Sequence, residues 1–364
     1  MRRSDVLDSE RKKNLPTEME FTRAGPVQTT VLPSSAPAPR TGSRGIRLLP
    51  ARTDGWRFDG ASTEPLRDIN FTIHPRVAAF IVAWVSCVSG ALANTPADPS
   101  ATLRARYAAL SQQLEHSAIQ RGLYLESTDS SRAPRGDAYA VIDYPFATVA
   151  AAFSSPANWC ESLILHLNVQ YCRASTRDGR PQLSAAVGKK TNQLLDDTYR
   201  INFAYTVAVS SANYTRVELS SRKGPLGTGN YLIALELTAL DEQRAFMHLQ
   251  YSYTQGFMAR CASSVYFSTS GRDKVGFTLI HDEDDPPRLV RGIRGALERN
   301  TMRYFLAFDA YLHALDSPAP QRFEQRIERW FADTERFARQ LHEVKHDEYI
   351  AMKRGQYLRQ QAVL

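Results

Sequence analysis

The stretch Gly136–Cys172, GDAYAVIDYPFATVAAAFSSPANWCESLILHLNVQYC, decides the fold. Its apolar pattern changes from a period of two to a helical period and back again. Ser155 and Pro156 have the residue types of a helix N-cap and a first helical position. The stretch therefore predicts, in order, a strand over 138–144, a small-residue helix over 146–153, a second helix from 156 to about 167, and a return strand over 168–174.

Long alternating segments follow this stretch. Between Tyr199 and Val209 every second residue is apolar, and the residues between them are polar or small. Such alternation is typical of an antiparallel strand with one buried face. The same pattern predicts strands around 217–219, 231–237, 245–253 and 275–280, with turns at Asn213 and Gly224–Gly229. The segment 257–269 is compatible with either a strand or a short helix.

A helical pattern begins after Pro286 and Pro287 and continues to Leu315. About 28 residues at roughly 1.5 Å each give about 40 Å, which is enough to cross a whole sheet. The order of elements therefore predicts an α+β fold. In this fold a curved antiparallel β-sheet grips a long C-terminal α-helix (a helix-grip fold), with additional N- and C-terminal helices.

Helical segments flank this predicted domain of residues 137–315. Residues 94–136 form a helical lead-in, since leucines and a tyrosine between Leu103 and Leu114 recur at helical spacing. Residues 316–364 hold an amphipathic helix over about 321–361, with near-heptad apolar spacing. Its stripe would either pack on the body of the same chain or mediate self-association through 321–361.

An uncharged run, Val77–Ala93, follows Arg76 and ends in a small-x-small sequence. These features are typical of a secretory signal peptide. The run is shorter than the roughly 20 residues of a membrane span. We therefore interpret 69–93 as a signal peptide, with an N-terminal membrane anchor as the alternative, and expect a periplasmic protein that is secreted through the inner membrane or anchored by 77–93.

Residues 1–68 are rich in Pro, Arg, Ser and Thr, and they show little hydrophobic periodicity. Such a composition cannot bury enough apolar surface to fold. We expect this segment to be disordered or to come from an over-extended translation start.

The composition as a whole is that of an ordinary globular protein, with 43% hydrophobic and 23% charged residues. The net charge is +7, but residues 1–93 supply more than half of that excess. No run of Lys and Arg is interleaved with aromatic residues. We therefore expect no nucleic-acid partner.

Three cysteines follow the signal segment: Cys160, Cys172 and Cys261. An oxidising periplasm permits disulfides, and Cys160 and Cys172 lie on adjoining predicted elements. These two are a candidate disulfide that would pin a helix to a strand; the alternative is three buried thiols. The spacing of the cysteines does not match a zinc site.

The order of elements resembles the helix-grip fold of the START-like superfamily, which includes lipid-transfer domains, plant pathogenesis-related proteins and polyketide cyclases. The resemblance covers about residues 137–315, and YPFATVAAAFSSPANW occupies the place of the family's strand-helix-helix opening. It rests on element order, and it carries over no catalytic residue. It implies a cavity between the sheet and the long helix, usually occupied by an apolar or amphipathic ligand.

A sheet that curls around a helix cannot pack along the whole length of that helix, and an elongated apolar pocket remains. His248 differs in strand parity from Tyr251 and Tyr253, so all three face the pocket only if a bulge intervenes. For every candidate, an ordinary core role is the alternative. The candidate lining residues are Tyr205, Tyr231, His248, Tyr251, Tyr253, Tyr304 and Phe308.

Three motifs suggest chemistry but have simpler explanations. Cys160 and His166 could pair as nucleophile and base, but their six-residue separation puts them on diverging helix faces. Gly224–Gly229 lacks the helix and Lys of a phosphate-binding loop, which favours a hairpin turn. His281–Asp285 lacks calcium-loop spacing and fits a solvated turn. The sequence thus predicts no catalytic set, no metal and no cofactor.

We interpret the chain as a periplasmic or membrane-associated START-like protein that binds or transports a hydrophobic molecule, such as a lipid, without catalysis. One alternative is a cavity enzyme of the cyclase or hydrolase type. The other is an envelope interaction module that acts through the C-terminal helix. The expected partners are a hydrophobic small molecule or lipid and the membrane.

Overall fold

The computed structural model of the protein describes residues 98–119, 122–130, 133–269, 271–281 and 286–362. They all fall in one unit of the chain. The predicted leader and signal segments, 1–68 and 69–93, lie outside the described residues. Within the described part, no helix is both long enough and apolar enough to cross a bilayer.

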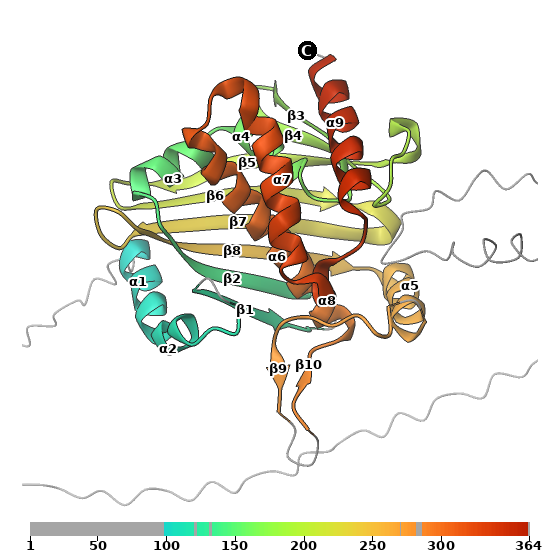
Figure 1. The fold of residues 1–364 in the computed structure, drawn as a ribbon, viewed down its shortest axis with the longest axis horizontal. Coiled ribbons are helices and arrows are strands. Elements are labelled where there is room, and N and C mark those ends of the chain that lie inside the picture. The colour runs from blue at the N-terminus through green and yellow to red at the C-terminus, as the bar shows by residue number, and fades with distance from the viewer. Residues whose placement is uncertain (1–97, 120–121, 131–132, 270, 282–285, 363–364) are drawn as a thin grey trace, which may run out of the picture. The chain divides into compact units, whose positions relative to one another are not determined.

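An eight-stranded antiparallel sheet lies at the centre of the described unit (Figure 1). Its strand order is β1-β2-β8-β7-β6-β5-β4-β3, so β2 pairs with β8 across a long stretch of sequence. The strands are β1 (Leu123–Thr128), β2 (Arg135–Ile142), β3 (Val169–Arg177), β4 (Arg180–Val187), β5 (Tyr199–Ser210), β6 (Tyr214–Lys223), β7 (Thr228–Ala239) and β8 (Ala245–Gln255).

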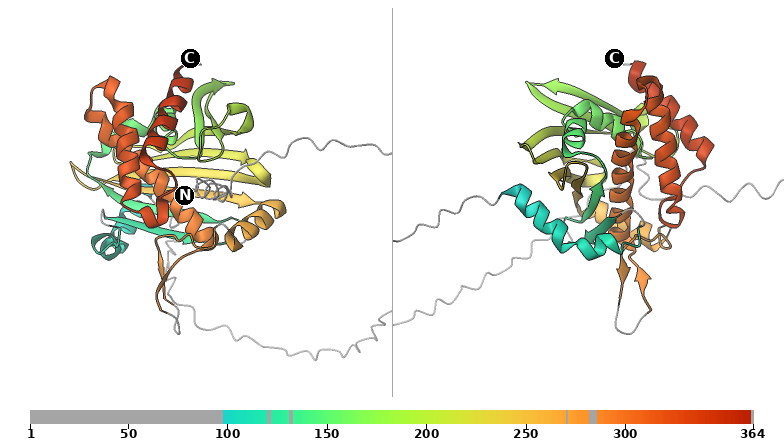
Figure 2. Two further views of the ribbon diagram at one scale, coloured as in Figure 1. Left: turned by 45° about the vertical axis from the view of Figure 1, so that its right-hand side comes forward. Right: turned by 60° about the vertical axis from the view of Figure 1, so that its left-hand side comes forward.

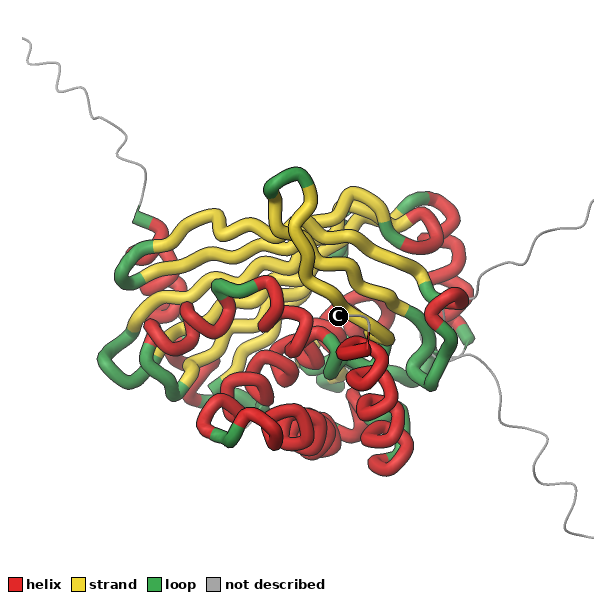
Figure 3. Tube along the Cα trace, turned by 90° about the horizontal axis from the view of Figure 1, so that it is seen from above, coloured by secondary structure: helices red, strands yellow, loops and turns green. Residues whose placement is uncertain are grey.

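Most helices gather on one face of this sheet (Figure 3). The long helix α6 has its main sheet contacts with β1, β2 and β8. Helix α1 instead packs on the opposite face, where it buries Tyr139 and Phe246. The α-helices are α1 (Pro99–Ala109), α2 (Ser111–Glu115), α3 (Phe146–Phe153), α4 (Pro156–Leu163), α5 (Phe257–Ser268), α6 (Gly292–His313), α7 (Arg322–Glu335), α8 (Ala338–Leu341) and α9 (His346–Ala362).

The predicted α+β helix-grip fold is confirmed. The helix α3 begins and ends where the sequence predicts, and α4 begins at Pro156 but ends at Leu163, four residues early. The first half of strand β5 shows the predicted alternation: Ile201, Phe203 and Tyr205 are buried, whereas their sequence neighbours face solvent. The prediction fails beyond Tyr205, where Val207 and Val209 are also exposed. The fold is therefore determined by patterns that are local in the sequence.

Other predicted elements were wrong. The lead-in contains a strand, β1, because residues 123–128 complete the open edge of β2. The predicted strand 275–280 does not enter the main sheet: Leu279–Ile280 (β9) pairs only with Arg288–Leu289 (β10) in a separate ribbon. The prolines before the long helix belong to this connection, so α6 begins at Gly292.

The C-terminal segment is also not one helix. Helices α7 and α9 fold back on each other through α8 (Figure 2). Trp330 stacks on Tyr349 at 4.9 Å, and Phe323 stacks on Tyr357 at 3.8 Å, which sets the two helices antiparallel. The apolar stripe of α7 is buried within the chain, with Ile327 and Trp330 at most 1% exposed.

Gly136 on β2 sets how closely α6 approaches the sheet. A Cβ atom at this position would lie 2.5 Å from Oγ1 of Thr301 on α6, a distance that real Cβ contacts do not reach. The absence of a side chain therefore lets α6 rest directly on β2.

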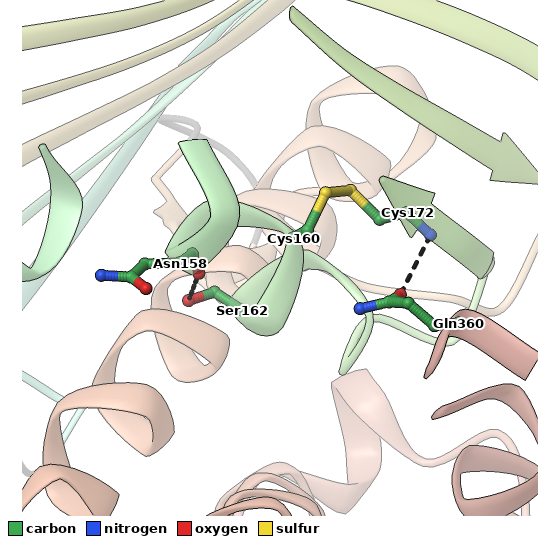
Figure 4. Close-up of a disulfide and its surroundings, with 5 residues drawn as sticks. All are labelled: Asn158, Cys160, Ser162, Cys172 and Gln360. Carbon is green, nitrogen blue, oxygen red and sulfur yellow. Dashed lines mark hydrogen bonds between the residues drawn. A yellow bond between two sulfur atoms is a disulfide. The ribbon is translucent and has the colours of Figure 1, made fainter. Parts of the chain in front are cut away.

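A disulfide joins Cys160 on α4 to Cys172 on β3, with the two Cα atoms 5.2 Å apart (Figure 4). The backbone N–H of Cys172 donates to Oε1 of Gln360 on α9, at 3.1 Å. Ser162 Oγ donates to the carbonyl oxygen of Asn158 one turn back on α4. The disulfide and the α9 contact together tie the helical layer to the edge of the sheet.

Replacing Cys160 and Cys172 together with Ser is expected to lower the free energy of unfolding by about 3 kcal/mol, because the unfolded chain regains the entropy of a short closed loop. Urea titrations of the oxidised protein measure the change. Cys261→Ser is the matched control, since the Cys261 thiol is free and exposed. Equal stability of the double variant and the oxidised wild type would contradict the prediction.

Candidate functional site

A cavity of about 110 Å³ lies between α6 and the sheet. Its walls come from α4 and the turn after it, from strands β3, β4, β5, β7 and β8, and from α5 and α6. Most of the lining side chains are aliphatic or aromatic. The cavity is lined by Leu163, His166, Asn168, Val169, Ala185, Val187, Lys190, Ile201, Phe203, Tyr231, Ile233, Tyr251, Tyr253, Tyr266, Phe267, Ala296, Asn300 and Tyr304.

Helix and strand periodicity together aim these side chains at one space. Ala296, Asn300 and Tyr304 are spaced four apart, so they share one face of α6. Phe308, four residues further on, continues the same row but packs against Phe153 and Trp159 instead. The cavity thus ends where the row meets the aromatic residues of α3 and α4.

Five rings form a continuous aromatic row along the cavity. His166 stacks on Tyr304, with ring centroids 4.7 Å apart, and Tyr304 contacts Tyr251 at 5.4 Å. The row continues from Tyr251 to Tyr253 at 5.7 Å, and from Tyr253 to Tyr231 at 5.4 Å. We call these five residues the aromatic row.

The structure divides the predicted lining residues. Tyr231, Tyr251, Tyr253 and Tyr304 line the cavity. Tyr205 and Phe308 do not, because both pack around Trp159, and the Tyr205 hydroxyl donates to the carbonyl oxygen of Phe153 at 3.0 Å. His248 also does not line the cavity, because side chains alternate along β8 and that of His248 lies on the face opposite to Tyr251 and Tyr253.

His248 points away from the cavity, to the opposite face of the sheet. The pairing of β2 with β8 runs without a register shift from Ile142 to Arg135, so no bulge turns His248 inward. Its Nε2 lies 2.7 Å from a carboxylate oxygen of Asp137, and its Nδ1 lies 2.7 Å from one of Glu236. The expectation that His248 lines the pocket is therefore corrected: this side chain joins β2, β8 and β7 on the outer face.

The charge state of His248 follows from these contacts. Burial by itself lowers the pKa of His248, but the hydrogen bonds to Asp137 and Glu236 outweigh burial and raise it. For Glu236, burial raises the pKa, and the bonds to His248 and Tyr214 overcome this and lower it to about 2. These shifts favour a protonated imidazole between two ionised carboxylates.

Replacing His248 with Gln is expected to change how stability depends on pH. Because the folded-state pKa of His248 is raised above 6.5, its contribution is fully present below pH 6.5 and is lost as the pH rises through the raised pKa. The contribution of Glu236 is present above pH 4.5 and is lost as the pH falls towards about 2. The free energy of unfolding of the wild type should therefore exceed that of the His248→Gln variant most between pH 4.5 and pH 6.5.

Urea unfolding at a series of pH values from about 5 to about 9 measures the difference. His342→Gln is the control, since His342 is about half exposed and lies away from this network. If the free energies of unfolding of the wild type and of His248→Gln change with pH in parallel over the whole range, the raised pKa of His248 is contradicted.

The polar residues of the cavity that were not predicted as part of it include His166, Lys190 and Asn300. His166 was considered only as a partner for Cys160, which the disulfide now excludes as a nucleophile. No signal in the sequence brings these three together, because they come from the turn after α4, the segment after β4, and α6.

His166 is buried, and its protonation is fixed by its neighbours. Its Nδ1 accepts the backbone N–H of Asn168 at 3.2 Å, which leaves the ring proton on Nε2. Burial, together with the charges of Arg303, Lys353 and Lys190, holds the pKa of His166 well below its usual value. A hydrogen-bonding interaction with the side chain of Asn300 partly opposes this lowering of the pKa. The geometry of this interaction is poor, because Nε2 has no well-formed hydrogen bond to a described residue.

The remaining motifs fit their simpler explanations or lie outside the described residues. Pro225–Gly227 forms a tight turn between β6 and β7, as a hairpin requires. Residues 282–285 of the acidic segment are not described. Among the residues that are, no cluster of His, Cys, Asp and Glu has the arrangement of a metal site.

No protein-family model and no curated protein matches the chain. Among solved structures, the Zhui aromatase/cyclase from a Streptomyces species is 9% identical with a TM-score of 0.26, and the match covers 34% of this chain and 70% of that one. Norcoclaurine synthase from Thalictrum flavum is 8% identical with a TM-score of 0.27, over 39% and 77% of the two chains. Human StAR-related lipid transfer protein 5 is 9% identical with a TM-score of 0.26, over 47% and 91%.

Likenesses with TM-scores this low carry no argument about ligand or activity. The fold assignment rests on the strand order and on the position of α6. The helix-grip fold of the chain encloses a cavity beside α6 that is lined mainly by aliphatic and aromatic side chains.

Proposed function

We propose that this protein binds a hydrophobic small molecule in the cavity beneath α6, and that it holds or carries this molecule without changing it chemically. The observation that carries the proposal is a cavity walled by apolar and aromatic side chains, with the buried Nε2 of His166 beside it and no well-formed hydrogen bond from this atom to a described residue. Buried polar groups in proteins are nearly always hydrogen-bonded. A ligand would supply the missing partner.

Two hydroxyl groups of the aromatic row support this proposal. Tyr251 and Tyr304 both line the cavity, and neither hydroxyl has a hydrogen-bond partner among the described residues. Burial raises the pKa of both tyrosines, so both hydroxyls stay protonated and can donate. Together with Nε2 of His166 they offer three donors to a bound molecule.

The size of the cavity limits what it holds. A buried apolar cavity of roughly 150 Å³ admits benzene, and this cavity, at about 110 Å³, is smaller, so it holds one ring at most without a movement of its walls. A lipid would require α5 to move, since this helix contributes Tyr266 and Phe267 to the lining. Its outer side exposes Phe257 and Val265, which are 70% and 63% accessible.

The chemistry of the lining favours binding over catalysis. His166 presents a proton on Nε2 and uses Nδ1 internally, so it is not poised as a base. No Asp or Glu lines the cavity among the described residues. A cavity enzyme of the cyclase or hydrolase type is the alternative function, and turnover of a bound compound would favour it.

The location and the partner surfaces are part of the same proposal. The disulfide supports a compartment outside the reducing cytoplasm, such as the periplasm. Attachment to the membrane that faces this compartment is the alternative location. Self-association through 321–361 would have to use side chains other than the buried stripe, such as Leu358, which is 67% exposed.

Filling the cavity tests the binding function. Ala296→Phe places a ring in the cavity from α6, and Ala332→Phe makes the same change at an exposed position of α7. Mass spectrometry of solvent extracts from the purified proteins should find a compound in the wild type and in Ala332→Phe that is reduced at least about tenfold in Ala296→Phe. The same compound at equal amounts in all three proteins would overturn the proposal.

A further inference from the structure

We infer that the ligand is an aromatic carboxylate with a single ring, and that its carboxylate binds at the end of the cavity formed by His166, Lys190 and Asn300. The inference rests on the proposed function and names the ligand class for the same cavity. It follows from where the donors lie, where the charge lies, and how much space remains beside them.

Nε2 of His166 is a buried hydrogen-bond donor at this end of the cavity. His166 is 3% exposed and borders the cavity, and its Nε2 has no well-formed hydrogen bond to a described residue. Because Nδ1 accepts the N–H of Asn168, Nε2 carries the proton and can only donate. A neutral apolar ligand would leave this donor without an acceptor, which costs free energy of binding. A carboxylate oxygen would accept the hydrogen bond and remove that cost.

Lys190 brings a positive charge to the lining of the cavity. Lys190 contributes the ammonium group at this end of the cavity, is 8% exposed, and pairs with Glu343 at 2.9 Å. It is the one charged side chain among the described residues that line the cavity. Arg303 and Lys353 lie close enough to His166 to lower its pKa further. Lys190, Lys274 and Arg303 all pair with the one carboxylate of Glu343. This basic surrounding, with no carboxylate in the described lining, favours an anion over a cationic ligand.

The aromatic row gives the cavity a shape that suits a flat ligand. His166 begins the aromatic row, so a molecule whose carboxylate meets Nε2 places its next atoms beside Tyr304 and Tyr251. Flat rings pack well against such a row. The volume of about 110 Å³ is smaller than the roughly 150 Å³ that admits benzene, so the cavity favours the smallest aromatic ligands over a long alkyl chain. The two tyrosine hydroxyls remain as donors for a second oxygen of the ligand.

Isothermal titration of the full chain with benzoate and with benzamide tests the inference. The two probes share a ring and nearly the same shape, and they differ in charge. Benzoate should bind at least about tenfold more tightly than benzamide at pH 7. Octanoate, which has the same carboxylate on an alkyl chain, should bind more weakly than benzoate.

Variants of His166 separate the donor from its structural role. His166→Asn keeps an acceptor for the N–H of Asn168 but loses the Nε2 donor, whereas His166→Gln places an amide N–H near the Nε2 position. Benzoate affinity should fall about tenfold in His166→Asn and recover in His166→Gln. Benzamide affinity should change little in either.

Lys190→Met provides a second test if a His166 variant unfolds, as judged by its thermal midpoint. Glu343 keeps Lys274 and Arg303 as partners, at 2.6 and 3.0 Å, so the carboxylate is not left alone. Benzoate should lose affinity in this variant, and benzamide should not.

The outcomes distinguish this inference from the proposed function. Equal binding of benzoate and benzamide, unaffected by Lys190→Met, would overturn the carboxylate site while leaving a binding cavity. Octanoate that binds more tightly than benzoate would overturn the aromatic part. If the Ala296→Phe experiment also shows no compound displaced, the proposed function itself is wrong.

Discussion

The contact between α6 and β2 at Gly136 is the constraint on which the rest of this structure depends. Thr301 occupies the space that a side chain at position 136 would need. The helix therefore rests on β1, β2 and β8, and a straight helix that rests on one side of a curved sheet cannot also fill the space above the other side. The cavity is the volume left over, and α4, α5 and the aromatic row close it.

The two faces of the sheet use polar groups in opposite ways. On the outer face, His248 is bonded to two carboxylates and stacked on Tyr139 at 4.4 Å, so its hydrogen-bonding capacity is used up. On the inner face, His166 keeps one donor without a well-formed hydrogen bond to a described residue. A fully paired histidine stabilises the fold, whereas an unpaired buried donor beside a cavity points to a ligand.

Much of the fold could be predicted because its signals are local. Residues 146–153 form α3 as their small-residue pattern indicates, and the alternation in β5 identifies its buried face. The predictions that failed depend on partners far away in the sequence. Residues 123–128 become a strand because β2 has an open edge, and α7 and α9 fold against each other because Trp330 and Tyr349 bury one another.

The sequence by itself determined the class of fold, the inward faces of the strands, and four of the cavity tyrosines, because strand and helix periodicity act over a few residues. It also contained the parity argument against His248, since side chains alternate along any strand. Only the tertiary structure decided that His166, Lys190 and Asn300 meet at one end of a small cavity. His166 and Lys190 meet because the segment that follows His166 and the segment that precedes Lys190 are hydrogen-bonded to each other, as between Asn168 and Gly188, and α6 adds Asn300 from a distant part of the chain.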